Sequence, residues 1–172
     1  MKKTTILFAA LFTILSFATQ AQRIAIVDVN DILNNLPEYI QAQDEIDVIA
    51  KAWQQEIAQE YDKVKSMYNE YQAEQVLMST EMKSKKEDEI MNKEKEVREM
   101  QKRKFGPEGE LFQKRQELVQ PIQDKVFEAI QGYADDRGYD IVLDKSSNTG
   151  ILFTSDKFDK SADIKKRLGI EE

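Results

Sequence analysis

A single apolar stripe runs through the middle of the chain. From 38 to 77 the sequence contains no glycine or proline, and its apolar residues recur at steps of three or four. They are Ile46, Ala50, Trp53, Ile57, Tyr61, Val64, Tyr68 and Tyr71. This spacing predicts one amphipathic helix, about 60 Å long at 1.5 Å per residue. Such a rod cannot bury its stripe alone, so it needs a partner helix.

The partner helix is predicted in the stretch that follows. Ser79 or the next residue, a threonine, can cap a new helix, which places the reversal of the chain near 78–82. A Gly-Pro pair predicts a break near 106–109, because proline removes a helical hydrogen bond. A denser apolar stripe resumes after this break. We therefore predict a long antiparallel, coiled-coil-like helical hairpin, a tentacle, over 37–137.

Short β-branched runs flank the hairpin. Residues 23–29 are almost continuously apolar, as in a strand that is covered on both faces. Asn30 or Asp31 can then cap a short helix. Residues 139–144 and 150–154 predict two more strands, joined by a connector rich in turn residues.

These elements predict an α+β fold that is mostly helical, with the hairpin mounted on a small β body. The body combines 22–36, which hold the first strand and the short helix, with 138–172, which hold the other two strands and a C-terminal helix. Three short strands bury too little apolar area for a stable body. We therefore expect neighbouring copies to pair their strands. The expected contact residues are Ile24, Ile26, Val27, Val29, Ile141, Val142, Leu143, Ile151, Leu152 and Phe153.

The first 21 residues have the layout of a secretory signal peptide. Lys2 and Lys3 precede an apolar run at 6–17, and Ala21 ends a short stretch of small and polar residues. That order of regions is typical of a cleaved leader. An uncleaved anchor is the alternative, although the apolar run is shorter than the roughly 20 residues that a span needs. No later segment could cross a membrane as a helix, whereas a peripheral contact with a membrane surface stays open.

Composition excludes several functional classes. The chain carries 25 basic and 32 acidic side chains, a formal charge of −7, and loss of the two leader lysines makes it −9 (−7 − 2). Such a charge argues against nucleic-acid binding. The sequence has neither cysteine nor histidine. Disulfides, most zinc sites and most nucleophile–base pairs are thereby removed, so we expect no enzyme, no metal and no cofactor.

The order of local features resembles the Skp/OmpH family of periplasmic chaperones. The features are Ile24-Ala25-Ile26-Val27-Asp28, Leu36-Pro37, Arg115-Gln116-Glu117-Leu118 with Pro121-Ile122, and Gly138-Tyr139-Asp140-Ile141-Val142-Leu143-Asp144. The resemblance covers essentially all of the chain after the leader. It implies a homotrimer with a nine-stranded body and three tentacles around a cavity. It also implies that the protein holds unfolded outer-membrane β-barrel proteins without ATP or a cofactor.

Two features depart from the family pattern. Well-studied members are strongly basic, whereas this chain is acidic, so a lipopolysaccharide site is not carried over. Basic residues gather only locally, with nine basic and six acidic side chains over 83–104. The break near 106–109 is the second departure, since it puts the straightness of the return helix in doubt.

A holdase needs adaptable apolar side chains that reach a client protein. Aromatic residues and methionine suit this role, and the candidates are Met67, Tyr71, Met78, Met82 and Met91. The alternative is that they belong to the seam between the helices, which we expect for Trp53, Ile57 and Val64. A different class of function stays open as well, namely an envelope coiled-coil spacer or adaptor that binds one folded partner.

Overall fold

The computed structural model describes residues 22–147 and 150–170, so the predicted leader at 1–21 lies outside the described residues. The chain divides into two compact units. The hairpin unit comprises Leu33–Phe127, and the body unit comprises the described residues up to Ile32 together with those from Glu128 onward.

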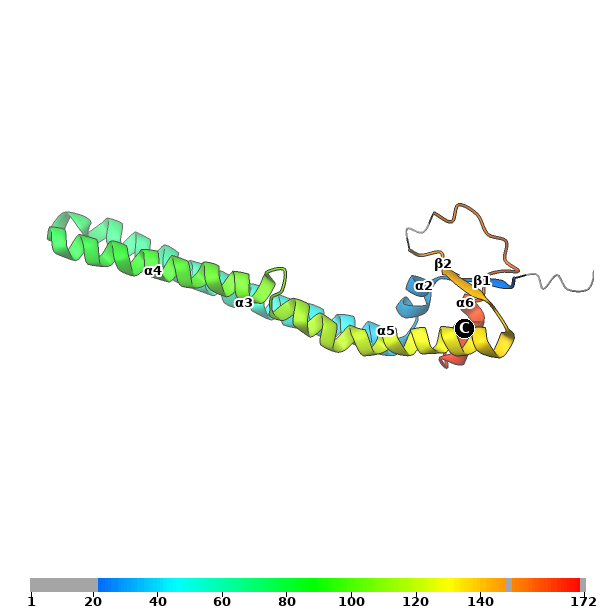
Figure 1. Cartoon of the computed structure of the whole chain (residues 1–172). Helices are drawn as coiled ribbons and strands as arrows, with labels where there is room; N and C mark the ends of the chain where they lie inside the picture. The colour runs from blue at the N-terminus through cyan, green and yellow to red at the C-terminus, as the bar shows by residue number, and fades with distance from the viewer. Residues whose placement is uncertain (1–21, 148–149, 171–172) are drawn as a thin grey trace, which may run out of the picture. The chain divides into compact units, whose positions relative to one another are not determined.

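The hairpin unit confirms the predicted antiparallel pair of helices (Figure 1). Helix α3 (Pro37–Glu74) is unbroken over 38 residues, with its proline in the first turn. A short 3₁₀ helix, η1 (Gln75–Leu77), leads into the reversal, and α4 (Thr80–Phe105) returns beside α3. The Ser79 side chain accepts a hydrogen bond from the backbone N–H of Met82 at 3.3 Å. This N-cap fixes the start of α4.

The seam between α3 and α4 holds a narrow hydrophobic core. Ile57, Val64 and Val97 form one buried cluster, against which Met100 and Phe105 pack. Trp53 meets Phe105 edge to face, with the ring centroids 6.2 Å apart. The apolar stripe that predicted the helix is therefore the seam itself at Ile57 and Val64. Further buried apolar residues of the hairpin unit are Leu33, Leu36, Ala42, Ile46, Ile90, Val119, Ile122 and Val126.

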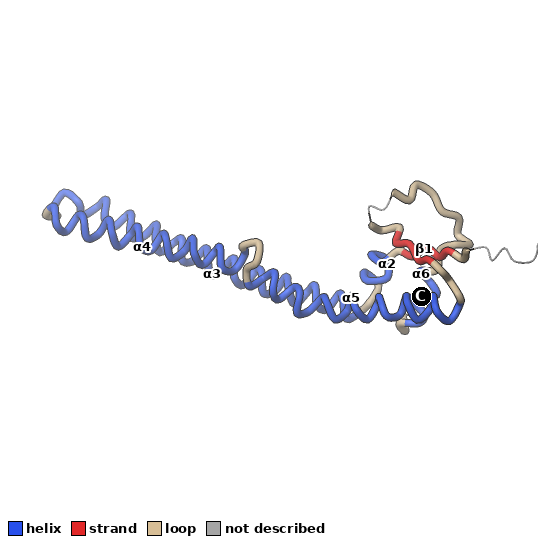
Figure 2. Tube along the Cα trace, in the orientation of Figure 1, coloured by secondary structure: helices blue, strands red, loops and turns tan. Residues whose placement is uncertain are grey.

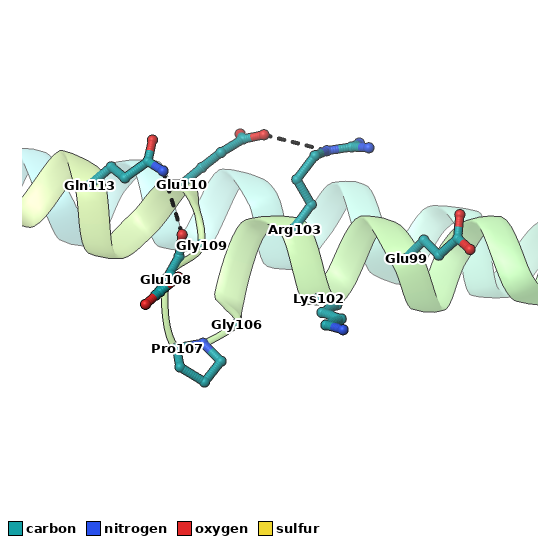
Figure 3. Close-up of a pocket in the computed structure, with 9 residues that line it drawn as sticks. All are labelled: Glu99, Lys102, Arg103, Gly106, Pro107, Glu108, Gly109, Glu110 and Gln113. Carbon is teal, nitrogen blue, oxygen red and sulfur yellow. Dashed lines mark hydrogen bonds and ion pairs between the residues drawn. The ribbon is translucent and has the colours of Figure 1, made fainter.

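A tight loop at 106–109 separates α4 from α5 (Glu110–Arg137) (Figure 3). The backbone N–H of Gly109 donates to the carbonyl of Gly106 at 2.9 Å. A Cβ at Gly109 would lie 2.7 Å from the Arg103 carbonyl oxygen, so the loop requires a residue without a side chain there. Arg103 and Glu110 form an ion pair across the loop at 3.4 Å. Specific contacts therefore define the conformation of this loop. Helix α5 begins after it and continues through Pro121.

The body unit contains a two-stranded parallel sheet (Figure 2). Strand β1 (Ile24–Val27) pairs with β2 (Ile141–Asp144) in the register Ile24↔Ile141. Helix α2 (Val29–Asn34) follows β1 in the chain, and helix α6 (Ser161–Arg167) follows β2. Gly138 ends α5 with a φ of 64°, as a left-handed helix cap requires. The buried apolar residues of this unit are Ala25, Ile26, Val27, Ile32, Tyr133, Ala134 and Ile164.

Two sequence predictions for the body are wrong. Residues 150–154 form no strand in this chain, because the free edge of β1 is used by residues further along. Ile26 donates to the carbonyl of Phe158 and accepts from the N–H of Lys160, both at 2.8 Å. Helix α2 is also capped earlier than expected, since the Asp28 carboxylate accepts from the N–H of Asp31 at 2.9 Å.

Candidate functional site

Lysines at the seam of the hairpin form ion pairs with glutamates of the facing helix. Lys104 is only 8% exposed, yet its ammonium lies 3.0 Å from Glu56 and 4.6 Å from the centre of the Trp53 ring. Lys93 reaches across the seam to Glu60 at 2.7 Å. Hydrogen bonds from Lys63 and Lys93 lower the pKa of the Glu60 carboxyl. These contacts hold the two helices in one register. Because the seam residues are occupied by these contacts, the candidate for binding is the exposed apolar surface of the distal hairpin.

The five predicted client-contact residues lie on the distal hairpin, but they differ in exposure. Met82 and Met91 are each 55% exposed. Met67 and Met78 are half-buried. Tyr71 is half-buried as well, and its hydroxyl donates a hydrogen bond to Glu87 on α4. Only the first two therefore present most of their side chain to the surroundings.

Two exposed apolar residues at the reversal of the hairpin were missed in the sequence, whereas Tyr61 and Tyr68 belong to the predicted apolar stripe. Val76 and Leu77, at the reversal, are 85% and 90% exposed. Tyr61 and Tyr68 are partly exposed, and their spacing of seven residues places them on one flank of α3. The Tyr61 hydroxyl donates to Gln101 at 3.2 Å, so its ring is held in place.

The body unit carries a second apolar surface. A hollow of about 360 Å³ is lined by Ile24, Ile26, Leu143, Ile151, Phe153, Thr154, Ser155 and Phe158. Leu152 is fully exposed and Phe153 is 87% exposed. A contiguous exposed apolar patch commonly marks an interaction surface. Five of the ten predicted contact residues line this hollow. Leu152, a sixth, lies between two of the lining residues in the sequence.

The other predicted contact residues are divided between core and surface. Val27 is buried within the chain's own core, as is Ile26, which also lines the hollow. Val29 and Val142 are half-buried. Ile141 is partly exposed. Contact with another copy thus remains a prediction, and it is best carried by the residues around the hollow.

Polar contacts beside the sheet close the loop that carries the exposed Leu152 and Phe153. The Lys145 ammonium lies 2.7 Å from the carboxylate of Asp159, which joins the two ends of this loop. Asp159 also accepts from the backbone N–H of Ser161 at 2.9 Å. The Ser161 hydroxyl in turn accepts from the N–H of Asp28 at 2.8 Å. Asp28 and Asp159 therefore have a structural role in the body.

Asp159 makes the stability of the body depend on pH. Burial would raise the pKa of its carboxyl, but the bonds from Lys145 and Ser161 outweigh burial and lower the pKa from 3.8 to about 2. A depressed pKa contributes stability above pH 3.8, and that stability is lost as the pH falls towards 2. We expect the free energy of unfolding to drop by up to about 2 kcal/mol over this range.

The variant Asp159→Asn serves as the reference for that prediction. It should be less stable than the wild type at pH 7 and should show a flatter pH profile, measured by urea denaturation between pH 5 and pH 2. Parallel profiles for the two proteins would contradict the assignment to Asp159.

None of the helices within residues 22–147 and 150–170 has a stretch apolar and long enough to pass through a membrane. In the same residues, no group of three or more carboxylates is arranged to hold a metal ion.

Comparison with protein families gave a match. A protein-family model described as "Outer membrane protein (OmpH-like)" matches residues 23–168, which include both strands, the whole hairpin and most of the C-terminal segment. A search among curated proteins found no match.

Proposed function

Because the chain belongs to the Skp/OmpH family, whose members are chaperones of outer-membrane proteins and not enzymes, we propose that it is a periplasmic holdase. In this proposal the protein is exported by a cleaved leader and binds unfolded outer-membrane β-barrel proteins. It prevents their aggregation without ATP. Three copies assemble through their bodies, and the client occupies the cavity between the hairpins.

The exposed methionines of the distal hairpin are the main support for client binding. Met82 and Met91 leave more than half of their side chains uncovered on a helix that is otherwise rich in charge. The flexible thioether side chain adapts to irregular apolar surfaces. Many such weak contacts retain a client without fixing its shape, and they permit its release without fuel.

The hollow of the body supports assembly. A surface that includes Leu152 and Phe153 would be costly to leave in water, and a second copy offers an equivalent apolar surface. Assembly would also bring several hairpins together, which multiplies weak client contacts.

The experiment that tests this function dilutes a urea-unfolded outer-membrane barrel protein into the chaperone without nucleotide. We expect light scattering to stay low and native mass spectrometry to record three chains with one client. The variant Met82→Ser/Met91→Ser should hold the client about fivefold less tightly, because about 0.5 kcal/mol is lost per truncated contact. The matched control Val48→Ser removes an exposed aliphatic residue of α3 and should hold the client normally.

The envelope spacer or adaptor remains the second candidate. It is favoured if the wild-type protein leaves several unrelated unfolded barrels to aggregate at their usual rate. If the methionine variant holds the client as tightly as the wild type, the client does not bind through these residues of α4. The holdase function would still be supported.

A further inference from the structure

The sulfur atoms of the chain are gathered in one region. Methionine is the only residue that contains sulfur here, because the sequence has no cysteine. Apart from the methionine at position 1, all of them lie within 67–100, namely Met67, Met78, Met82, Met91 and Met100. This stretch runs from the second half of α3 through most of α4. Any chemistry that acts on sulfur therefore acts on the hairpin and not on the body.

The structure separates these methionines by their exposure. Met82 and Met91 are each 55% exposed, whereas Met67 and Met78 are half-buried. Met100 packs against the buried cluster of the seam. An oxidant in solution reacts fastest with the side chains that it can reach, so susceptibility follows exposure. Met82 and Met91 are therefore expected to react first, and Met100 last.

Oxidation changes the property that makes methionine suitable for an apolar contact. Hydrogen peroxide transfers one oxygen atom to the thioether sulfur, which is oxidised by two electrons to a sulfoxide, while the peroxide is reduced to water. The sulfoxide is polar, so it disrupts contacts that the thioether would make. The reaction is reversible, because a methionine sulfoxide reductase removes the oxygen as water while two of its thiols form a disulfide.

We propose that Met82 and Met91 are reversible oxidation sites through which peroxide weakens the binding of a client. This inference rests on the proposed holdase function, since it requires that the two side chains contact the client. The fold is retained in the oxidised state, because the core of the seam consists of Ile57, Val64 and Val97, which contain no sulfur. Oxidation thus alters the binding surface of α4 without separating the helices.

Peptide mapping by mass spectrometry tests the order of oxidation without any client. In the native protein treated with limiting hydrogen peroxide, we expect Met82 and Met91 to gain an oxygen atom severalfold faster than Met67 and Met100. In urea, where every methionine is exposed, the rates should become equal. The circular dichroism of the protein oxidised at the two fast sites should match that of the reduced protein. Equal rates in the native protein, or a loss of helical signal, would overturn the proposal.

Client holding by the oxidised protein tests the consequence. The wild type with sulfoxides at 82 and 91 should hold an unfolded outer-membrane barrel protein about fivefold less tightly, and methionine sulfoxide reductase should restore holding. The variant Met82→Leu/Met91→Leu keeps the apolar volume without the sulfur, so it should hold the client equally before and after peroxide. The matched control Met67→Leu/Met100→Leu should lose holding on oxidation as the wild type does.

The outcomes separate this inference from the proposed function. If the reduced wild type holds no client, both the holdase function and the inference are wrong. If the wild type holds the client equally well in both oxidation states, the inference is wrong and the holdase function stands. The same conclusion follows if Met82→Leu/Met91→Leu loses as much holding on oxidation as the wild type.

Discussion

The double variant Leu152→Asp/Phe153→Asp is expected to be a monomer. Both side chains are almost fully exposed in the single chain, so their replacement leaves its fold intact. In an assembly that covers the hollow of the body, each contributes about 1.5–3 kcal/mol of apolar burial. Since 1.4 kcal/mol corresponds to a factor of ten, association should weaken by more than two orders of magnitude.

Light scattering coupled to size-exclusion chromatography measures this effect. The control Val48→Asp/Phe127→Asp places the same charges at exposed apolar sites of α3 and α5 and should keep the mass of the wild type. The circular dichroism of both variants should match the wild type. If the double variant keeps the wild-type mass, the hollow is not the surface through which copies assemble.

A second large effect is expected from Val97→Asp in the seam of the hairpin. Val97 is buried against Ile57 and Val64, and the nearby lysines at 93 and 104 already pair with Glu60 and Glu56. The substitution loses apolar burial and places a carboxyl group without a partner in the seam. We expect a loss of about 4 kcal/mol in the free energy of unfolding.

Urea denaturation followed at 222 nm measures this loss. Val97→Ala should cost about 1–2 kcal/mol, and Met91→Asp, at an exposed position of the same helix, should cost about 0.5 kcal/mol or less. The deficit of Val97→Asp should shrink at low pH, because protonation removes the buried charge. A deficit equal to that of Met91→Asp would show that the seam does not hold the helices together.

The hairpin could be predicted from the sequence because its signals are local. The steps between apolar residues gave α3, and Ser79 marked the start of α4 through a bond made three residues away. The Gly-Pro pair marked the loop at 106–109 in the same manner. Each of these signals acts within one or two helical turns, where propensity and capping dominate.

The body was predicted less well because its contacts join distant residues. The run Ile151-Leu152-Phe153 has strand composition, but a strand needs a partner edge, and residues 158–160 occupy the free edge of β1. Nothing in the composition of Phe158-Asp159-Lys160 indicates a strand. Likewise, Asn30 and Asp31 looked like caps of α2, but the turn after β1 placed Asp28 in that position.

The exposed apolar residues of the distal hairpin were predicted in part. Met82 and Met91 are exposed as expected, since the facing stripe is sparse there. Val76 and Leu77 were overlooked because they continue the composition of the preceding helix, and only the position at which α3 ends decides that they leave the seam. Tyr71 was predicted to contact clients, but it is half-buried, and its hydroxyl donates a hydrogen bond to Glu87 on α4.

The long-range pairing of the body strands determines the order in which the protein folds. Arg23 and Asp140, which lie at the start of the two paired strands, are joined by a hydrogen bond although they are 117 residues apart in sequence. Contacts of this separation form slowly, whereas the helices of the hairpin require only neighbouring residues. During synthesis β1 is therefore the first strand to be made but cannot pair until almost the whole chain has followed. We therefore expect the hairpin to fold first and the body to close last.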